Sequence, residues 1–91
     1  MDMEITFPGG ARVDASFGPY TVHTDQPPMG GGEGSAPTPF AVFLSSIGTC
    51  AGIYVLGFLR KRGLQTEGVR LIQKIHTNPL NGMVSEIELN I

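Results

Sequence analysis

Hydrophobic and polar residues alternate along three short segments at the start of the chain. The alternation is clearest in residues 11–17 (ARVDASF), where Val13, Ala15 and Phe17 fall on one face of a strand and polar residues fall on the other. Residues 3–7 and 20–25 alternate more weakly. The turn-forming stretches Pro8-Gly9-Gly10 and Gly18-Pro19 separate the three segments. This pattern predicts a three-stranded antiparallel meander in which Arg12 lies on the polar face of the second strand.

A long uncharged helix is predicted after a loop at residues 26–37 (QPPMGGGEGSAP). The loop contains three prolines and four glycines, which disfavour regular structure, and it is either functional or a plain linker. Thr38 is a good helix N-cap, and Pro39 suits the first helical position because its missing N–H would have no partner there. Arg60-Lys61-Arg62 suits the negative end of the helix dipole, and Gly63 suits the left-handed C-terminal cap.

Two further strands are predicted at residues 67–77 and 83–91, joined by the tight turn NPLNG at residues 78–82. In the last strand the expected core-facing residues are Met83, Ile87, Leu89 and Ile91. The order is therefore βββ-α-ββ, an α+β fold with one long central helix packed on antiparallel sheet. Because residue 91 is apolar and lies within an apparent strand, we expect a C-terminal segment to be missing from a single domain at residues 1–91. The alternative is a minimal form that completes its sheet with another chain.

Composition narrows the possible partners. The 91 residues carry a net charge of −2 and only 15% charged residues. This argues against nucleic acid as a partner and favours a surface covered by a second subunit. One cysteine excludes an intramolecular disulfide and a cysteine-rich zinc site, and the two histidines lack metal-ligand spacing, so no metal or cofactor is expected. The N-terminus does not resemble a signal peptide, which favours a reducing cytoplasm.

The uncharged segment also permits a membrane interpretation. Residues 40–59 are long enough to cross a bilayer, and Gly48 and Gly52 match a transmembrane packing motif. The amphipathic strands on both sides, however, need an apolar helix as a packing partner, so we favour a buried helix of a soluble protein without membrane contact. Glycine inside a helix costs up to about 1 kcal/mol relative to alanine. Gly48 and Gly52 therefore indicate close approach of another backbone, either a strand or a second copy of the helix.

Cys50 lies in the middle of the predicted helix and allows two interpretations. A free cysteine often packs as a small buried hydrophobe. A reactive cysteine needs a cation to favour its thiolate, and a position in mid-helix offers little help from the helix dipole. Arg12 is the candidate cation, because Arg60 and Lys61 lie about 15 Å along the helix axis at 1.5 Å per residue.

The segment from residue 24 to residue 63, with "TDQP…GG…APTPF" followed by "LSSIGTCAG", resembles the OsmC/Ohr superfamily. The similarity covers nearly all of this chain but only the N-terminal part of a typical member. The resemblance implies a tightly intertwined homodimer with its central helices packed together. It also implies a thiol peroxidase for organic hydroperoxides that is regenerated by thiols. Cys50 matches the peroxidatic cysteine, which becomes a sulfenic acid, and Arg12 loosely matches the arginine that stabilises the thiolate.

Two positions depart from the family pattern. Phe40 stands where classical members have a glutamate, and these 91 residues contain no second cysteine to resolve the sulfenic acid. We therefore keep two hypotheses. In the first, the protein is a peroxidase with Cys50 and Arg12 as catalytic residues and an external thiol as reductant. In the second, it is a non-catalytic protein of the same fold that binds a small apolar ligand at the dimer interface, lined by Phe40, Phe43 and Tyr54.

Overall fold

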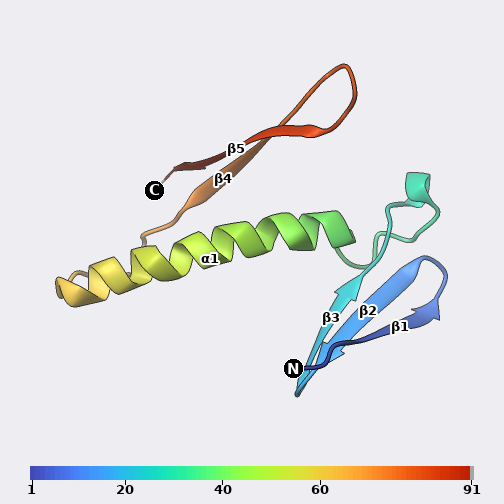
Figure 1. The fold of residues 1–91 in the computed structure, drawn as a ribbon, viewed down its shortest axis with the longest axis horizontal. Coiled ribbons are helices and arrows are strands. Elements are labelled where there is room, and N and C mark those ends of the chain that lie inside the picture. Colours follow the sequence, from blue (N-terminus) through green and yellow to red (C-terminus); the bar gives the residue numbers. More distant parts are fainter. Residues whose placement is uncertain (91) are drawn as a thin grey trace. The chain divides into compact units, whose positions relative to one another are not determined.

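The computed structural model describes residues 1–90, with side chains at all of these positions except 85 and 88–90 (Figure 1). Its elements follow the order β1 (Glu4–Gly9), β2 (Arg12–Phe17), β3 (Tyr20–Thr24), a 3-10 turn η1 (Pro28–Gly30), α1 (Pro39–Lys61), β4 (Ile72–Thr77) and β5 (Val84–Asn90). The α+β class and the βββ-α-ββ order are confirmed. The predicted core positions of Leu89 and Ile91 lie outside the described side chains.

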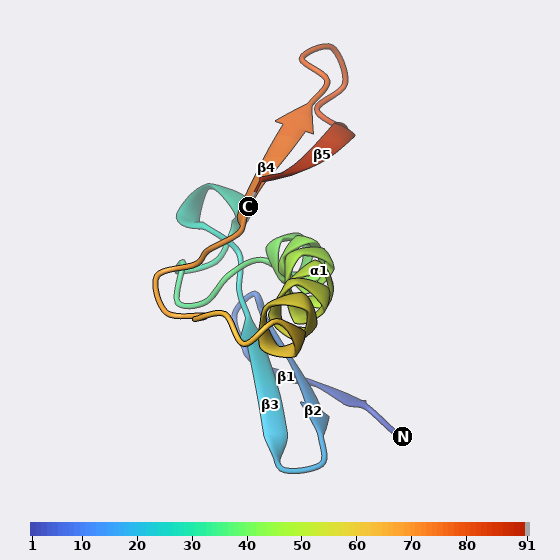
Figure 2. The same ribbon diagram turned by 90° about the vertical axis from the view of Figure 1, so that its left-hand side faces the viewer.

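Strands β1, β2 and β3 form an antiparallel sheet in that order, and Figure 2 shows them side by side. Asp14 on β2 lies directly opposite Thr6 on β1 and His23 on β3. Opposite residues share a face of the sheet, and the face alternates along each strand. Arg12, Asp14 and His23 therefore share one face, as the alternation of residues 11–17 predicts for Arg12 and Asp14. Phe17 and Tyr20 pair on the other face, with ring centroids 6.0 Å apart.

Strand β1 does not end at Pro8, as its turn-forming residues suggested. It continues to Gly9, which pairs with Arg12 after an irregularity in register between Thr6 and Gly9. Pro8 is accommodated because β1 is an edge strand, where a missing N–H breaks no ladder hydrogen bond. Gly10, with φ +56°, then makes the turn into β2.

Both predicted ends of helix α1 are confirmed by their capping hydrogen bonds. The Thr38 hydroxyl accepts the backbone N–H of Ala41 at 3.1 Å. At the C-terminal end, Leu64 N–H donates to the Leu59 carbonyl at 3.0 Å and Gly63 N–H donates to the Arg60 carbonyl at 3.1 Å. Gly63 has φ +65°, and this pair of bonds is the Schellman arrangement. The uncharged segment thus lies within one continuous helix of 23 residues.

Strands β4 and β5 form a separate antiparallel hairpin. The tight turn predicted at residues 78–82 is present, and two asparagine side chains stabilise it. Asn78 Oδ1 accepts Leu80 N–H at 2.8 Å, and Asn81 Oδ1 accepts Met83 N–H at 2.9 Å. Strand β4 begins at Ile72, so the predicted start at residue 67 is wrong. The reason is a turn in which Gly68 has φ +79° and Val69 N–H donates to the Thr66 carbonyl at 3.2 Å.

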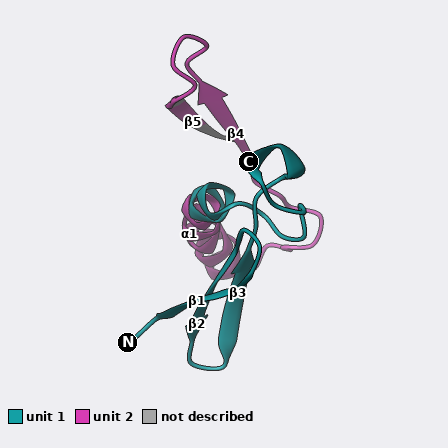
Figure 3. Cartoon of the chain, turned by 90° about the vertical axis from the view of Figure 1, so that its right-hand side faces the viewer, with its two compact units in different colours: residues 1–45 teal, residues 46–91 magenta. Residues whose placement is uncertain are grey.

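The chain divides into two compact units, residues 1–45 and 46–91, and helix α1 runs across the division (Figure 3). Among the described side chains, no apolar one is buried, and only Thr24 and Asp25 are buried. None of the residues of α1 is buried. The apolar side chains of α1 therefore lie at the surface of the unit to which each belongs.

Candidate functional site

Cys50 lies in the middle of α1, within the unit formed by residues 46–91, and its side chain is exposed. Gly48, two residues before Cys50 in the sequence, lies so close to the Gln73 side chain of β4 that a Cβ at this position would meet the Gln73 amide oxygen. Gly52 has open space at the corresponding position. The neighbour at Gly48 is thus a side chain of the hairpin and not a backbone, and Gly52 has no neighbour within 4 Å, so the predicted approach of another backbone is not seen among the residues that the structure describes.

Arg12 lies at the start of β2, in the unit formed by residues 1–45, so the two predicted catalytic residues belong to different units. The Nε–H of Arg12 donates to the Gly9 carbonyl at 3.2 Å. Among the residues whose side chains the structure describes, no carboxylate forms an ion pair with Arg12. The guanidinium thus keeps its two Nη groups for an acceptor from elsewhere.

The predicted ligand-lining residues fall into two groups. Phe40 and Phe43, in the first turns of α1, stack with ring centroids 6.1 Å apart and an interplanar angle of 21°. Tyr54 lies in the other unit, is 80% exposed, and lines an open apolar hollow of about 380 Å³ with Val55, Phe58, Leu59 and Val69. Phe40 thus packs against Phe43, whereas Tyr54 lies beside a different set of apolar side chains.

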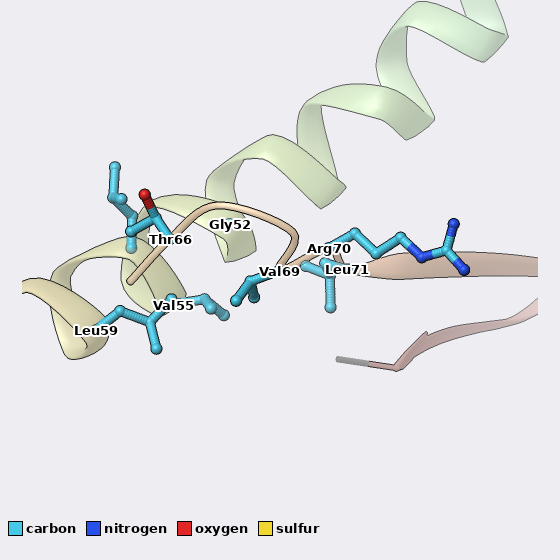
Figure 4. A pocket seen from close by; sticks show the side chains of 8 residues that line it. Gly52, Val55, Leu59, Thr66, Val69, Arg70 and Leu71 are labelled. Carbon is cyan, nitrogen blue, oxygen red and sulfur yellow. The ribbon is translucent and has the colours of Figure 1, made fainter. Parts of the chain in front are cut away.

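A neighbouring pocket of about 200 Å³ lies between α1 and the segment before β4 (Figure 4). Val55 and Leu59 from the helix face Val69 from that segment, and the guanidinium of Arg70 extends away from them. Beside these hollows, the Arg62 guanidinium lies 3.8 Å from the centre of the Phe58 ring. This stretch of α1 therefore offers an apolar surface with a cationic end.

A polar cleft of about 310 Å³ lies on the N-terminal unit, and sequence reasoning missed most of it. Its walls are formed by Pro8, Arg12, Asp14, His23, Thr24, Ser35 and Ala36. His23 Nδ1 lies 3.0 Å from Asp14 Oδ2, and the side chains of His23 and Asp14 are 68% and 14% exposed. His23 was not among the predicted site residues. The register that sets it opposite Asp14 gives it a partner and a place beside Arg12.

Asp25 organises the glycine-rich loop and was also missed. Its side chain is 1% exposed and accepts backbone N–H groups from Gln26 at 2.7 Å, Glu33 at 3.3 Å and Ser35 at 3.1 Å, and the Ser35 hydroxyl at 2.6 Å. These bonds favour the ionised form, and the Ser35 hydroxyl contributes most, so that the pKa of Asp25 falls from 3.8 to about 2. Through Ser35, the carboxylate holds one wall of the polar cleft in place.

The sequence does contain a signal for the hydrogen bonds that the Asp25 carboxylate makes to the loop. An aspartate followed within a few residues by prolines, glycines and a serine is typical of a side chain that accepts loop N–H groups. Which N–H groups it accepts depends on how the loop folds back. Gly32 lies so close to Gln26 and Asp25 that a Cβ there would overlap the Gln26 backbone.

Helix α1 also satisfies the length and composition test for a membrane span, with a mean hydropathy of 1.9 over its most apolar window. The core helices of soluble proteins pass the same test, so this is weak evidence for a membrane.

Comparison with protein families identifies one match. The family model described as OsmC-like protein matches residues 32–91, which is about two thirds of the chain and includes the end of the glycine-rich loop, all of α1 and the β4–β5 hairpin. A comparison with curated proteins gave no match. Arg12, Asp14, His23 and Asp25 lie before the matched segment, whereas Cys50 lies within it.

Proposed function

Because the chain belongs to the OsmC-like protein family, we propose that it is a thiol-dependent peroxidase that reduces organic hydroperoxides through Cys50. The observation that carries this proposal is an exposed thiol in the middle of an uncharged helix within the matched segment. Exposure is what a nucleophile that must meet a substrate requires.

The proposed first step is attack by the Cys50 thiolate on the distal oxygen of the hydroperoxide. A sulfur–oxygen bond forms and the oxygen–oxygen bond breaks. Sulfur is oxidised to a sulfenic acid, and the leaving alkoxide takes up a proton and departs as an alcohol. An external thiol then attacks the sulfenic acid, which releases water and leaves a mixed disulfide. A second thiol attacks that disulfide and restores the Cys50 thiol.

Arg12 is proposed to stabilise the thiolate and the negative charge that develops on the leaving oxygen. Two observations support this role: among the residues whose side chains the structure describes, no carboxylate forms an ion pair with Arg12, and Arg12 lines an open cleft. The proposal requires Arg12, from the same chain or its partner, to reach Cys50 in the active assembly.

That assembly is proposed to be a homodimer. Helix α1 has no buried residue in one chain, and large apolar side chains such as Phe40, Ile53 and Phe58 are more than half exposed. Only 15% of the residues are charged, which leaves little polar surface to keep such a helix in water as a monomer. Proteins of this family are generally soluble. We place the protein in the cytoplasm, where a thiol reductant is available and a lone cysteine stays reduced.

The test is a single-turnover reaction of the reduced protein with one equivalent of an organic hydroperoxide, in the presence of a sulfenic-acid trap and read by intact mass. We expect one trap molecule per chain in the unmodified protein, none in Cys50→Ser, and a strongly slowed reaction in Arg12→Ala. Arg60→Ala, which removes an exposed arginine at the end of α1, is the matched control and should react normally. Unlabelled Cys50 in a folded sample would contradict the proposal.

A second candidate function is supported by the hollow beside Tyr54. Its lining side chains are apolar, and its volume of about 380 Å³ suits a small apolar ligand. In this alternative the protein is a non-catalytic binder, with Phe40 and Phe43 covering the ligand in the dimer. A fluorescent apolar probe should then bind saturably to the wild-type protein and more weakly to Phe58→Ala. Equal binding by both proteins would exclude this hollow as the ligand site.

A further inference from the structure

The C-terminal half of α1 has a further hollow, of about 490 Å³, that combines apolar and cationic side chains. We call it the cationic hollow; it is lined by Ile53, Tyr54, Gly57, Phe58, Lys61 and Arg62. It shares Tyr54 and Phe58 with the apolar hollow of about 380 Å³. All of its lining residues belong to the unit formed by residues 46–91.

The lining residues of the cationic hollow are ordered by polarity along the helix axis. Ile53, Tyr54 and Phe58 are each more than half exposed and form its apolar part. Lys61 is the last residue of α1, and Arg62 follows it directly. From Ile53 to Lys61 the hollow extends about 12 Å along the axis, at 1.5 Å per residue. A ligand that follows this order has an apolar tail and a polar head group.

Gly57 leaves the middle of the hollow open. A Cβ at this position would meet no atom within 4 Å. Glycine is unfavourable inside a helix, and here it removes the side chain that would stand in the hollow. Gly57 lies about 140° around the helix from Gly52, at 3.6 residues per turn. The hollow and the helix contact proposed at Gly52 are therefore on different faces of α1.

The charges of this unit favour an anionic head group. Residues 46–91 contain five of the six Lys and Arg residues of the chain but only three of its eight Asp and Glu residues. Three of these cations are consecutive, at residues 60–62, and they exceed the roughly half an elementary charge at the negative end of a helix. Among the side chains that the structure describes, no carboxylate forms an ion pair with any of the three. A ligand of complementary charge is therefore an anion.

Phe58 orients the Arg62 guanidinium in a way that suits a carboxylate. The guanidinium carbon lies 3.8 Å from the centre of the Phe58 ring. A guanidinium that lies over a ring uses its face for this contact, and the N–H groups in its plane stay available to an acceptor. A carboxylate can accept two of these N–H groups at once. The Lys61 ammonium, which lines the same hollow, is a second donor.

We propose that the cationic hollow binds a single-chain carboxylate, with its alkyl chain along Ile53, Tyr54 and Phe58 and its carboxylate at Lys61 and Arg62. The proposal rests on the second candidate function, for which it names the class of ligand. A small anion without a chain would leave the apolar side chains in water. An uncharged chain would leave the two cations without a partner. A ligand with both parts uses the whole hollow.

The experiment follows the two tyrosine rings of the whole chain by NMR. Tyr54 lines the hollow, and Tyr20 on β3 lies in the other unit and serves as an internal reference. Decanoate below its micelle concentration is the probe, decan-1-ol is its uncharged counterpart, and acetate is an anion without a chain. We expect decanoate to shift the Tyr54 signals saturably, with Tyr20 unchanged and acetate without effect.

The comparison between decanoate and decan-1-ol separates the proposal from the function on which it rests. Because a hydrogen bond to a charged group changes affinity by about tenfold or more, decanoate should bind at least tenfold more tightly than decan-1-ol. Equal affinities would overturn the carboxylate assignment and leave the second candidate function standing. If neither compound shifts Tyr54, both are wrong. Because no hydroperoxide is present, the result does not depend on the reactivity of Cys50.

Charge variants test which cations hold the head group. Lys61→Gln and Arg62→Gln should each weaken decanoate binding by about tenfold and leave decan-1-ol binding unchanged. Arg60→Gln removes the same charge from the same cluster at a residue that does not line the hollow, so it is the matched control and should bind like the wild type. Unchanged affinity in the first two variants, or an equal loss in Arg60→Gln, would contradict the proposal.

Gly57→Ala tests the hollow itself without weakening the fold. The added methyl group stands in the open space at Gly57 and favours the helix, so the variant should be at least as stable as the wild type and bind decanoate more weakly. Undiminished binding by this variant would place the ligand elsewhere. Sedimentation with phosphatidylglycerol vesicles checks for a membrane surface as the partner. Binding to vesicles without a response to monomeric decanoate would overturn the proposal.

Discussion

The glycine-rich loop and helix α1 reverse the usual relation between regular structure and burial. The loop between β3 and α1 is rich in glycine and proline, yet it is held by a buried carboxylate with four hydrogen bonds. Helix α1 is capped at both ends and 23 residues long, yet none of its residues is buried. The loop is stabilised within its own unit, whereas the helix has an exposed apolar surface, which the proposed dimer would cover. Four changes test this difference.

The largest effect is expected from Asp25→Asn, which tests whether the loop is held from within its own unit. An asparagine keeps the size of the side chain but loses the charge and half of its acceptor capacity. We expect loss of hydrogen-exchange protection at Glu33 and Ser35 and a clear fall in the melting temperature. Asp2→Asn, at an exposed position, is the control. Unchanged protection at Ser35 would show that the loop is held by other contacts.

Acid should weaken the same hydrogen bonds of the Asp25 carboxylate without a mutation. The pKa of Asp25 is lowered to about 2 from an ordinary value of 3.8, so its contribution to stability is complete above pH 3.8. As the pH falls through about 2 this contribution is lost, because protonation removes the charge that the N–H groups stabilise. Amide signals of the loop should therefore change between about pH 4 and pH 2 in the wild-type protein. The Asp25→Asn protein should lack this transition, and a transition of the same size in both would contradict the assignment.

On the helix, Gly52→Ala tests whether another backbone covers α1. Within one chain a Cβ at Gly52 would meet no atom within 4 Å, so alanine alone should stabilise the helix by up to about 1 kcal/mol. In the proposed dimer, overpacking should instead destabilise by about 1–3 kcal/mol. We expect the second outcome, measured as weaker dimerisation by sedimentation.

Gly57→Ala is the matched control for that experiment. Gly57 also has open space around it, but it lies about 140° around the helix from Gly52 at 3.6 residues per turn. We expect this variant to dimerise normally and to gain helix stability. If both alanines stabilise equally, no backbone packs closely at Gly52 and the helix–helix dimer proposal loses its support.

The smallest effect is expected at the junction of the two regions. Thr38→Ala removes the hydroxyl that caps Ala41 N–H and should cost about 1 kcal/mol in the free energy of unfolding. Thr38→Ser retains the hydroxyl and should stay close to the wild type. Chemical denaturation of the three proteins at one concentration measures the difference. A fall of the same size in Thr38→Ser would show that the cap is not its cause.

Local chemistry made the ends of α1 and the loop of the β4–β5 hairpin predictable. Thr38, Gly63 and Asn81 each act through groups at most a few residues away, so their roles follow from residue type and position. Alternation likewise placed Arg12 and Asp14 on one face of β2. The start of β4 could not be predicted in this way, because residues 67–71 have a strand-like pattern although the turn at Gly68 interrupts it.

The candidate sites differ in the same way: some depend on residues that are close in the sequence and others on residues that are far apart. The sequence alone was enough to single out Cys50, because it is the one cysteine and lies in an unusually uncharged helix. The Asp14–His23 pair joins residues nine positions apart, and the Asp25–Ser35 bond joins residues ten positions apart. Their pairing depends on strand register and on the path of the loop, which are set by many weak contacts acting together. The helix and its thiol are therefore readable from neighbouring residues, whereas the polar cleft exists only once β2, β3 and the loop have folded against one another.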